Sequence, residues 1–484
     1  MKRYFLPTMI FFLLLAGCKK TLEEHPESIA AEDFYNTPAE IESGLDAIYS
    51  PLRDQNSLGA LYQTQLECYA DYMYGRGSHA VLNNYQGLDN TNVTRVAAFW
   101  SDFYASIRNA NIIIQKTPLA RSVGDSARAK YIAEARFMRA LDYFFLVRNW
   151  AGVPLRTENN IDSIDLKRSS AADVYAFIVS DLQYAEANLP DAPRLVGTPS
   201  RWSAKTVLAD VYMNMGQYAG ARDEALAVIQ SNKVSLVPVS TATDFDAKLF
   251  GANVTNSTEE IFYLKFARAP SGQGNTYPMY AFYPNSGYYP PGGYYTFYSD
   301  SVNNKVLANW DRNDLRYSAN WYGQKFGLGN TTVLNRKFID KQAVTAAGND
   351  YPMYRYADLL MLYAEADMRV NKATTPDAME KLNMVHRRAY GKNPLIPDPT
   401  VDFALASYAD TTSFINLLVK EEAYEDCSEG KRWLYLKRLG VVKQVIMDIK
   451  GIAVADKHLL WPIPTIEFDY NKAIDPATDQ NPGY

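Results

Sequence analysis

The sequence is poor in cysteine and histidine. Only three cysteines and four histidines occur in 484 residues. The histidines (His25, His79, His386 and His458) are scattered, and no pair of them has the spacing of zinc ligands. We therefore expect no metal site, and no cofactor is implied. Cys68 and Cys427 could pair, but two buried free thiols are the favoured interpretation.

The chain also lacks a positive net charge and a long apolar run after its first residues. Its formal net charge is −5, which argues against nucleic-acid binding, where a basic face is expected. No segment after the N-terminus has the roughly 20 apolar residues of a membrane helix. Any contact with a membrane should therefore come from the N-terminus.

Catalytic signatures are missing as well. The sequence has no G-x-S-x-G elbow, no H-E-x-x-H, no phosphate-binding P-loop and no G-x-G-x-x-G after a strand. A glycosidase would need two placed carboxylates. Glu134, Asp358 and Glu365 lie on strongly patterned helices close to arginines, so ion pairs between packed helices explain them better. We expect that the protein is not an enzyme.

What the N-terminus does contain is a lipoprotein signal. Met1, Lys2 and Arg3 begin it, residues 4–14 are apolar, and the segment 15–18 (LAGC) ends it with a cysteine. Cleavage would leave an acylated Cys18, and loss of Lys2 and Arg3 would make the chain more negative. We predict a signal peptide at 1–17, an acylated tether at 18–31 and one domain at 32–484.

Apolar residues at helical spacing predict a mostly α-helical protein. Helices are expected within residues 34–49, 100–111, 128–148, 170–189, 204–229 (a pair), 355–390 (a second pair) and 412–438. Small residues at facing positions of the pairs resemble degenerate tetratricopeptide repeats. The predicted helical scaffold covers about 32–234 and 351–440, with a C-terminal segment at 441–484. Residues 53–95 show no clear period and are expected to be loops.

The helical period is lost between 235 and 350. Residues 277–298 contain eight tyrosines, two phenylalanines and several prolines and glycines. Prolines and glycines at this density exclude a helix, and the aromatic content is too high for plain disorder. We expect a long structured loop, the kind of segment that carries function on a rigid scaffold.

Six separated segments, in order, resemble the SusD/RagB family of surface lipoproteins of Bacteroidetes. They are residues 134–140 (EARFMRA), 150–155 (WAGVPL), 168–190, 355–366 (RYADLLMLYAEA), 382–389 and the C-terminal pair 460–464 (LWPIP) and 480–484 (QNPGY). Residues 420–433 depart from the family pattern, because the usual arginine is missing and Asp-Cys-Ser replaces an apolar pair. This departure affects local helix packing and not the resemblance.

The resemblance implies a cell-surface, lipid-anchored protein of the outer membrane. Such a protein binds oligosaccharides and passes them to a SusC-like TonB-dependent β-barrel transporter. A peptide- or glycopeptide-binding protein of the RagB type is an alternative within the family. A protein–protein scaffold and a glycosidase are alternatives outside it.

Aromatic side chains in loops are the candidates for sugar contact, because a ring offers an apolar face and tyrosine adds a polar tip. The candidate ligand-binding residues are Tyr72, Tyr74, Tyr85, Tyr283, Tyr288, Tyr289, Tyr294, Tyr295 and Trp321. Asn83, Asn84, Trp310, Asp311, Arg312 and Tyr322 lie in the same two zones. The alternative is that most of these rings pack the loops onto the helices or contact the transporter.

Overall fold

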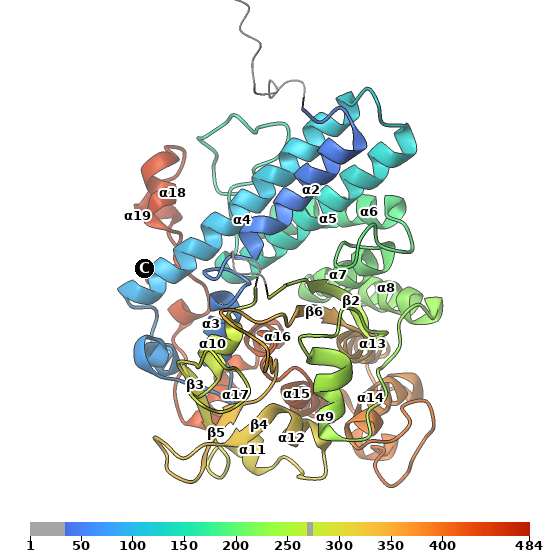
Figure 1. Cartoon of the computed structure of the whole chain (residues 1–484), viewed down its shortest axis with the longest axis vertical. Helices are drawn as coiled ribbons and strands as arrows, with labels where there is room; N and C mark the ends of the chain where they lie inside the picture. Colours follow the sequence, from blue (N-terminus) through green and yellow to red (C-terminus); the bar gives the residue numbers. More distant parts are fainter. Residues whose placement is uncertain (1–33, 269–273) are drawn as a thin grey trace, which may run out of the picture.

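The structure is a computed structural model that describes residues 34–268 and 274–484. The predicted signal peptide, Cys18 and the tether lie outside the described residues. Helices dominate the molecule, and strands are few and short (Figure 1). The predicted mostly α-helical scaffold is therefore confirmed. No described helix is long and apolar enough to cross a bilayer.

Eight helices pack one against the next and form the scaffold. They are α2 (Pro38–Leu52), α4 (Asn90–Lys116), α5 (Asp125–Trp150), α6 (Ala171–Asn188), α7 (Arg201–Asn214), α8 (Tyr218–Ser231), α13 (Tyr356–Asn371) and α14 (Pro376–Ala389). α13 packs on α8 although residues 232–355 separate them in sequence. The array of helix pairs thus resumes after a long insertion, as in a repeat protein.

Side-chain caps fix where several of these helices begin. Ser170 accepts a hydrogen bond from the backbone N–H of Asp173, and Thr375 accepts one from that of Ala378. Such caps satisfy amide groups that have no partner within the helix. The predicted start of the helix at residue 170 therefore agrees with the structure to within a residue.

Smaller elements complete the chain. The helices are α3 (Leu61–Tyr69), α9 (Ala242–Phe245), α10 (Tyr277–Ala281), α11 (Lys305–Ala308), α12 (Leu315–Asn320), α15 (Thr411–Glu425), α16 (Arg432–Leu439), α17 (Val442–Lys450), α18 (Thr465–Tyr470) and α19 (Pro476–Asp479). The short 3-10 and π segments are η2 (Gly77–Asn84), η3 (Thr117–Leu119), η4 (Asp246–Phe250), η5 (Leu405–Tyr408) and η6 (Asp456–His458).

Three expectations about secondary structure were wrong in part. Residues 53–95 contain α3 and the start of α4, because all nine residues of α3 are buried and a fully buried helix shows no amphipathic period. Residues 277–281 form the short helix α10, in which Pro278 occupies the first turn, where proline is tolerated. The stretch 412–438 is two helices, α15 and α16, separated by a buried turn.

Two small antiparallel sheets lie in the insertion. One has the strand order β1 (Tyr74–Gly75), β3 (Phe297–Asp300), β5 (Thr332–Asn335) and β4 (Trp321–Gly323). The other pairs β2 (Glu260–Leu264) with β6 (Tyr351–Arg355). β1 comes from the N-terminal third of the chain, so the first sheet joins the insertion to the helical scaffold.

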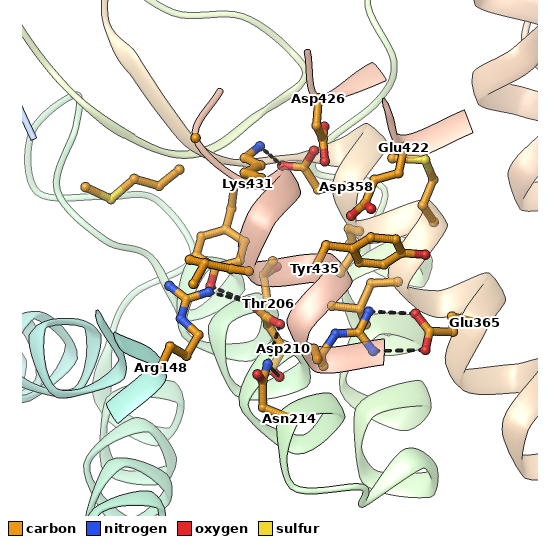
Figure 2. Close-up of a pocket in the computed structure, with 18 of the residues that line it drawn as sticks. Arg148, Thr206, Asp210, Asn214, Asp358, Glu365, Glu422, Asp426, Lys431 and Tyr435 are labelled. Atoms are coloured by element: carbon orange, nitrogen blue, oxygen red, sulfur yellow. Dashed lines mark hydrogen bonds and ion pairs between the residues drawn. The ribbon is translucent and has the colours of Figure 1, made fainter. Parts of the chain in front are cut away.

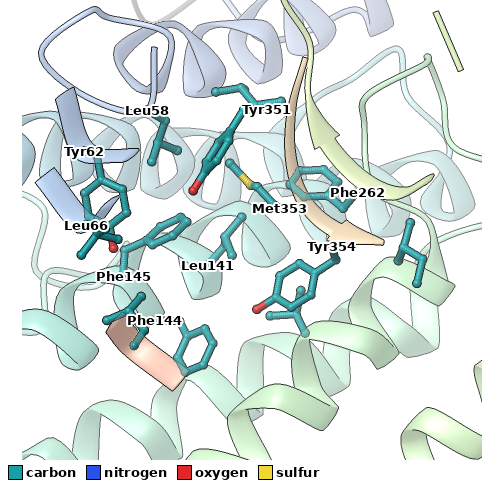
Figure 3. Close-up of a cluster of buried hydrophobic side chains, with 14 of the residues drawn as sticks. Leu58, Tyr62, Leu66, Leu141, Phe144, Phe145, Phe262, Tyr351, Met353 and Tyr354 are labelled. Atoms are coloured by element: carbon teal, nitrogen blue, oxygen red, sulfur yellow. The ribbon is translucent and has the colours of Figure 1, made fainter. Parts of the chain in front are cut away.

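A large aromatic and aliphatic core holds the insertion against the helices. Figure 3 shows Leu141 and Phe145 of α5 facing Tyr62 of α3 and Tyr351 of β6. The Tyr62 ring lies edge-on to Phe145, with 5.4 Å between ring centroids. Edge-to-face contacts of this kind add to the free energy of burial.

A buried ionic network links the end of β6, α14, α15 and the residue that precedes β2. The Arg355 guanidinium lies 2.9 Å from Glu259, 2.8 Å from Glu425 and 2.8 Å from Glu429, and all four side chains are buried. Arg388 pairs with Glu259 and Glu425. The segment 420–433 that departs from the family pattern therefore supplies several of the carboxylates of this network.

The expected ion pairs between helices are confirmed. Glu365 of α13 pairs with Arg438 of α16 at 2.6 Å, and Asp358 of α13 pairs with Lys431, the N-cap of α16, at 2.5 Å. Glu134 instead pairs with Arg194 at 3.1 Å, a residue far from it in sequence. Cys68 and Cys427 are both free and buried, as favoured from the sequence.

Candidate functional site

Five half-buried aromatic rings form a continuous group beside the first sheet. We call Tyr74, Tyr283, Tyr295, Tyr298 and Phe326 the aromatic platform. Tyr74 stacks beside Tyr298 with 5.8 Å between ring centroids, and Phe326 lies 5.8 Å from Tyr298 and 5.2 Å from Tyr295. Tyr283 lies 4.6 Å from Tyr295. Each ring is partly exposed to solvent while its neighbours hold it in place.

Strand pairing places the first two rings. Tyr74 of β1 is the register partner of Tyr298 of β3, and Gly75 that of Phe297. Side chains alternate along a strand, so Phe297 is buried and Tyr298 faces outward. A Cβ at Gly75 would lie 2.6 Å from the carbonyl oxygen of His79, so only glycine allows η2 to pack this closely.

Backbone hydrogen bonds hold the loop that carries the next rings. The N–H groups of Tyr294, Tyr295 and Thr296 donate to the carbonyls of Met279, Phe282 and Tyr280, respectively. Tyr295 has φ 39°, a left-handed conformation that is unusual for a bulky residue. Strain of this kind persists only where surrounding contacts enforce it, and it concentrates at binding sites.

Polar and cationic groups border the platform. The Arg76 guanidinium lies 3.9 Å from the centroid of the Tyr295 ring and donates to the Tyr294 carbonyl at 3.0 Å. The Lys450 ammonium lies 4.8 Å from the Tyr74 ring, and burial raises the pKa of the Tyr74 hydroxyl. Flat apolar surfaces beside hydrogen-bond donors suit a ligand that alternates C–H faces and hydroxyls.

Two of the predicted ligand-binding tyrosines are instead part of the core. Tyr72 is fully buried, and its hydroxyl donates to Glu67 at 3.0 Å. Tyr85 is fully buried as well; it stacks on Trp433 and donates to the Tyr69 carbonyl. Neither ring has a free face, so the prediction that they contact ligand is corrected.

Tyr289 and Trp321 are corrected for the same reason. The Tyr289 hydroxyl donates to the carbonyl of Thr345 at 2.8 Å, and its ring packs in a small cluster with Phe282. Trp321 starts β4 and faces the buried Tyr72 ring. In both cases packing against the insertion removes the ring from solvent.

The other candidates divide between the platform and its surroundings. Tyr74, Tyr283 and Tyr295 belong to the platform, and Tyr294 is 59% exposed at its edge. Tyr288 is half-buried against Tyr322, outside the platform. The remaining residues of the two zones are engaged elsewhere: Trp310 stacks on Tyr424, Arg312 on Tyr317, Asp311 accepts from Tyr390, Asn83 donates to Gly75, and Asn84 caps Gln86.

Three residues of this region were not among the predicted candidates. Tyr298 ends the tyrosine-rich stretch 277–298, so composition could have indicated it. Phe326 lies in a glycine-rich turn, and Arg76 follows β1. Only tertiary contacts bring these last two residues to the tyrosines.

A cavity of about 120 Å³ lies between α7, α13 and α16 (Figure 2). Its charged lining is largely paired internally: Arg438 holds Glu365 with two bonds of 2.9 and 2.6 Å, and Lys431 holds Asp358 at 2.5 Å. Burial, followed by the charge of Asp426, raises the pKa of Glu422 well above its usual range. Ligand pockets usually measure about 300 Å³ or more, so this cavity suits no sugar chain.

Among the described residues, Asp358, Asp426 and Glu429 could place carboxylate oxygens around one ion. Lysine and arginine side chains of the protein already bind these oxygens. Lys431 bonds Asp358 and Glu429, and Arg355 lies 3.0 Å from Asp426. The cluster is therefore an ion-pair network and a poor metal site.

Comparison with protein families identifies two matches. Residues 20–213 match a family described as "Starch-binding associating with outer membrane", and residues 283–484 match the SusD family. SusD-like protein P2 of Formosa agariphila is 27% identical over the full length of both chains. A SusD-like protein of Bacteroides ovatus is 31% identical over 44% of this chain and 40% of its own.

Solved structures show the same fold. A SusD homolog from Bacteroides thetaiotaomicron has a TM-score of 0.77 at 20% identity, covering 94% of this chain and 98% of its own. A laminarin-binding SusD-like protein has a TM-score of 0.73 at 21% identity, with coverages of 93% and 100%. Surface glycan-binding protein A from Bacteroides fluxus has a TM-score of 0.75 at 20% identity, again with coverages of 93% and 100%.

Proposed function

Because this chain belongs to the SusD/RagB family, we propose that it is a cell-surface lipoprotein that captures oligosaccharides. It would deliver them to a SusC-like TonB-dependent transporter in the outer membrane. The observation that carries the proposal is the aromatic platform. Its partly exposed rings are held by neighbouring rings and by strand pairing, so little order has to be gained when a sugar binds.

Capture, and not bond cleavage, is the proposed mechanism. The rings would stack on the C–H faces of successive sugars, while tyrosine hydroxyls and Arg76 would bond to their hydroxyl groups. Most carboxylates of the cavity between α7, α13 and α16 are paired with arginine or lysine, and the platform rings carry no acid–base pair. Two similar proteins are named for glycan binding, and neither name describes an enzyme.

A peptide ligand is less well supported by the geometry. Extended peptides usually add a strand to an exposed sheet edge. The edge strands of the first sheet, β1 and β4, have only two and three residues. So short an edge offers few backbone hydrogen bonds, whereas the ring surface beside it favours a sugar chain.

Titration of the purified protein with a panel of oligosaccharides tests this function. We expect binding of at least one glycan, measured by calorimetry, and no released product when the same mixtures are analysed by chromatography. Product release that is lost when Glu422 is changed to Gln would favour a glycosidase. Binding of peptides alone would favour the RagB-type alternative.

Anchoring through Cys18 is proposed from the signal sequence, since no described helix spans a membrane. Bacterial lipoprotein processing adds more than one acyl chain, and stable anchoring needs more than one. Movement of the sugar across the membrane would then require a partner, because no helix among the described residues spans a membrane.

Cell fractionation tests the anchor and the partner together. The wild-type protein should sediment with membranes and, after detergent extraction, should copurify with a β-barrel of much larger mass. In cells that lack this barrel, Cys18→Ala should leave the membrane fraction while the wild-type protein remains. If the variant still sediments with membranes there, the anchor lies elsewhere.

A further inference from the structure

Arginines of the described chain mostly pair with carboxylates, but two arginines beside the aromatic platform do not. Arg76 contacts the Tyr295 ring and the Tyr294 carbonyl. Arg95 of α4 donates to the Ser78 hydroxyl at 2.6 Å and to the Asn92 side chain at 2.7 Å. Neither forms an ion pair with a carboxylate of residues 34–268 or 274–484. Other arginines, such as Arg53 and Arg168, also lack an ion pair, so the position of these two beside the platform is the informative feature.

Both arginines act on one pair of rings, Arg76 by a direct contact and Arg95 through its charge. Arg76 contacts the loop at Tyr294, and the Tyr294 ring lies 5.9 Å from Tyr280. The positive charge of Arg95 in turn lowers the pKa of the Tyr280 hydroxyl, although burial raises that pKa overall. Both arginines are also next to the same short segment: Arg76 precedes Gly77 in the chain, and Arg95 forms a hydrogen bond with Ser78. We call Arg76, Arg95, Tyr280 and Tyr294 the cationic edge of the platform.

Carboxylates around the cationic edge do not neutralise it. The acidic residue that acts electrostatically on Arg95 is Asp89, the N-cap of α4. Its Oδ1 atom already accepts bonds of 2.9 and 2.7 Å from the backbone and side chain of Asn92. Burial lowers the pKa of His79 to about 3, with Arg95 as the second cause, so His79 remains neutral at pH 7.

Arg76 lies over the Tyr295 ring, so a ligand that approaches this face of the ring would contact the guanidinium first. Its guanidinium covers the Tyr295 ring at 3.9 Å and uses one donor on the Tyr294 carbonyl. A planar guanidinium has five N–H donors, so most of them remain for a ligand. Stacking on a ring fixes the plane of the guanidinium, which favours two-point binding of a carboxylate or a sulfate group.

From these observations we propose that the platform selects acidic glycans, in which a sugar carries a carboxylate or a sulfate ester that binds Arg76 beside Tyr294. Arg95 would add long-range electrostatic attraction. This inference rests on the proposed function, because it names the class of glycan that the same platform binds. The shared chemistry is an anionic group on a sugar, and separate probes distinguish a uronic acid from a sulfate ester.

Three probes test the proposal by calorimetric titration: an oligogalacturonate, a sulfated galactan oligosaccharide and a neutral laminarin oligosaccharide. At least one acidic probe should bind about tenfold or more tightly than the neutral one. Its affinity should fall as sodium chloride is raised, because salt screens exposed charges. The affinity for the neutral probe should change little with salt.

Variants then identify the group responsible. Arg76→Gln should weaken binding of the acidic probe about tenfold and leave any binding of the neutral probe within about twofold. Arg76→Lys should weaken it less, since charge remains while the planar fork is lost. Arg222→Gln is the matched control, because it removes a surface arginine of α8, a helix that Figure 1 shows far from β3, and binding should not change.

The outcomes separate this inference from the function on which it rests. Tighter binding of the neutral probe, or an unchanged affinity of Arg76→Gln for the acidic probes, would overturn acidic selectivity while leaving glycan capture intact. Failure of every glycan to bind the folded protein would overturn both. A preference for oligogalacturonate over the sulfated probe, or the reverse, would assign the anionic group.

Discussion

Replacement of Arg355 by methionine is expected to lower the free energy of unfolding by about 3–5 kcal/mol, the usual cost of breaking a buried ion pair from one side. The Arg355 side chain is fully buried and bonds to Glu259, Glu425, Asp426 and Glu429. Its removal leaves these carboxylates without a full set of cations in a region shielded from water. Urea denaturation followed by circular dichroism measures the change.

A surface arginine whose side chain is 29% exposed provides the control. Arg222 pairs with its neighbour Asp223, whose side chain is 64% exposed. Exposed pairs contribute about 1 kcal/mol or less, so Arg222→Met should change the unfolding free energy by no more than that. If Arg355→Met is as mild as the control, the network does not hold the insertion against the helices.

The same network predicts how the stability of the fold depends on pH. Burial alone would raise the pKa of Glu425, but Arg388 and Arg355 outweigh it and hold that pKa well below its usual range. Burial would also raise the pKa of Glu429, but Arg355 and Lys337 hold that pKa well below its usual range. A lowered carboxylate pKa stabilises the fold at pH values above about 4.3, the pKa in the unfolded chain. This stabilisation is lost as the pH falls below that value, because protonation of the carboxylates breaks the ion pairs.

Amphipathic helices were the part of the fold that the sequence predicted well. The apolar stripe of α5 and the cap of α6 are local signals: the stripe indicates which face is buried, and the cap indicates where the helix begins. The resumption of helix pairing at 355–390 was equally visible. The packing of α13 on α8 was not predicted; in the structure Ala221 and Ala366 lie in one cluster at this contact, where small residues let the helices approach.

The site was predicted less well, because burial of a ring depends on distant segments. Tyr72 and Tyr74 are two residues apart in an unpatterned stretch, yet one is fully buried and the other borders solvent. What decides between them is the pairing of β1 with β3, more than 200 residues away. Composition could indicate an aromatic loop zone, but only tertiary contacts select its exposed rings.

The second large effect is expected from the platform itself. The double variant Tyr283→Ala/Tyr298→Ala should weaken binding of the cognate glycan about a hundredfold, which corresponds to about 2.7 kcal/mol. Truncation of an aromatic anchor in an interface commonly costs about 2 kcal/mol or more, and a partly solvated sugar surface should lie somewhat below that value for each ring. These two rings are half-buried, so their loss should leave the fold intact.

Calorimetric titration of the double variant, with circular dichroism as the check on folding, measures this effect. Tyr470→Ala is the matched control, since Tyr470 is a 70% exposed tyrosine on α18, outside the platform. Tyr289→Ala and Trp321→Ala would not serve, because both rings are buried and their loss would unfold the insertion before it tested binding. Unchanged affinity in the double variant would mean that the platform rings only pack the loop or contact the transporter. The sugar-binding surface would then have to lie nearer the half-buried Tyr288 and Tyr322.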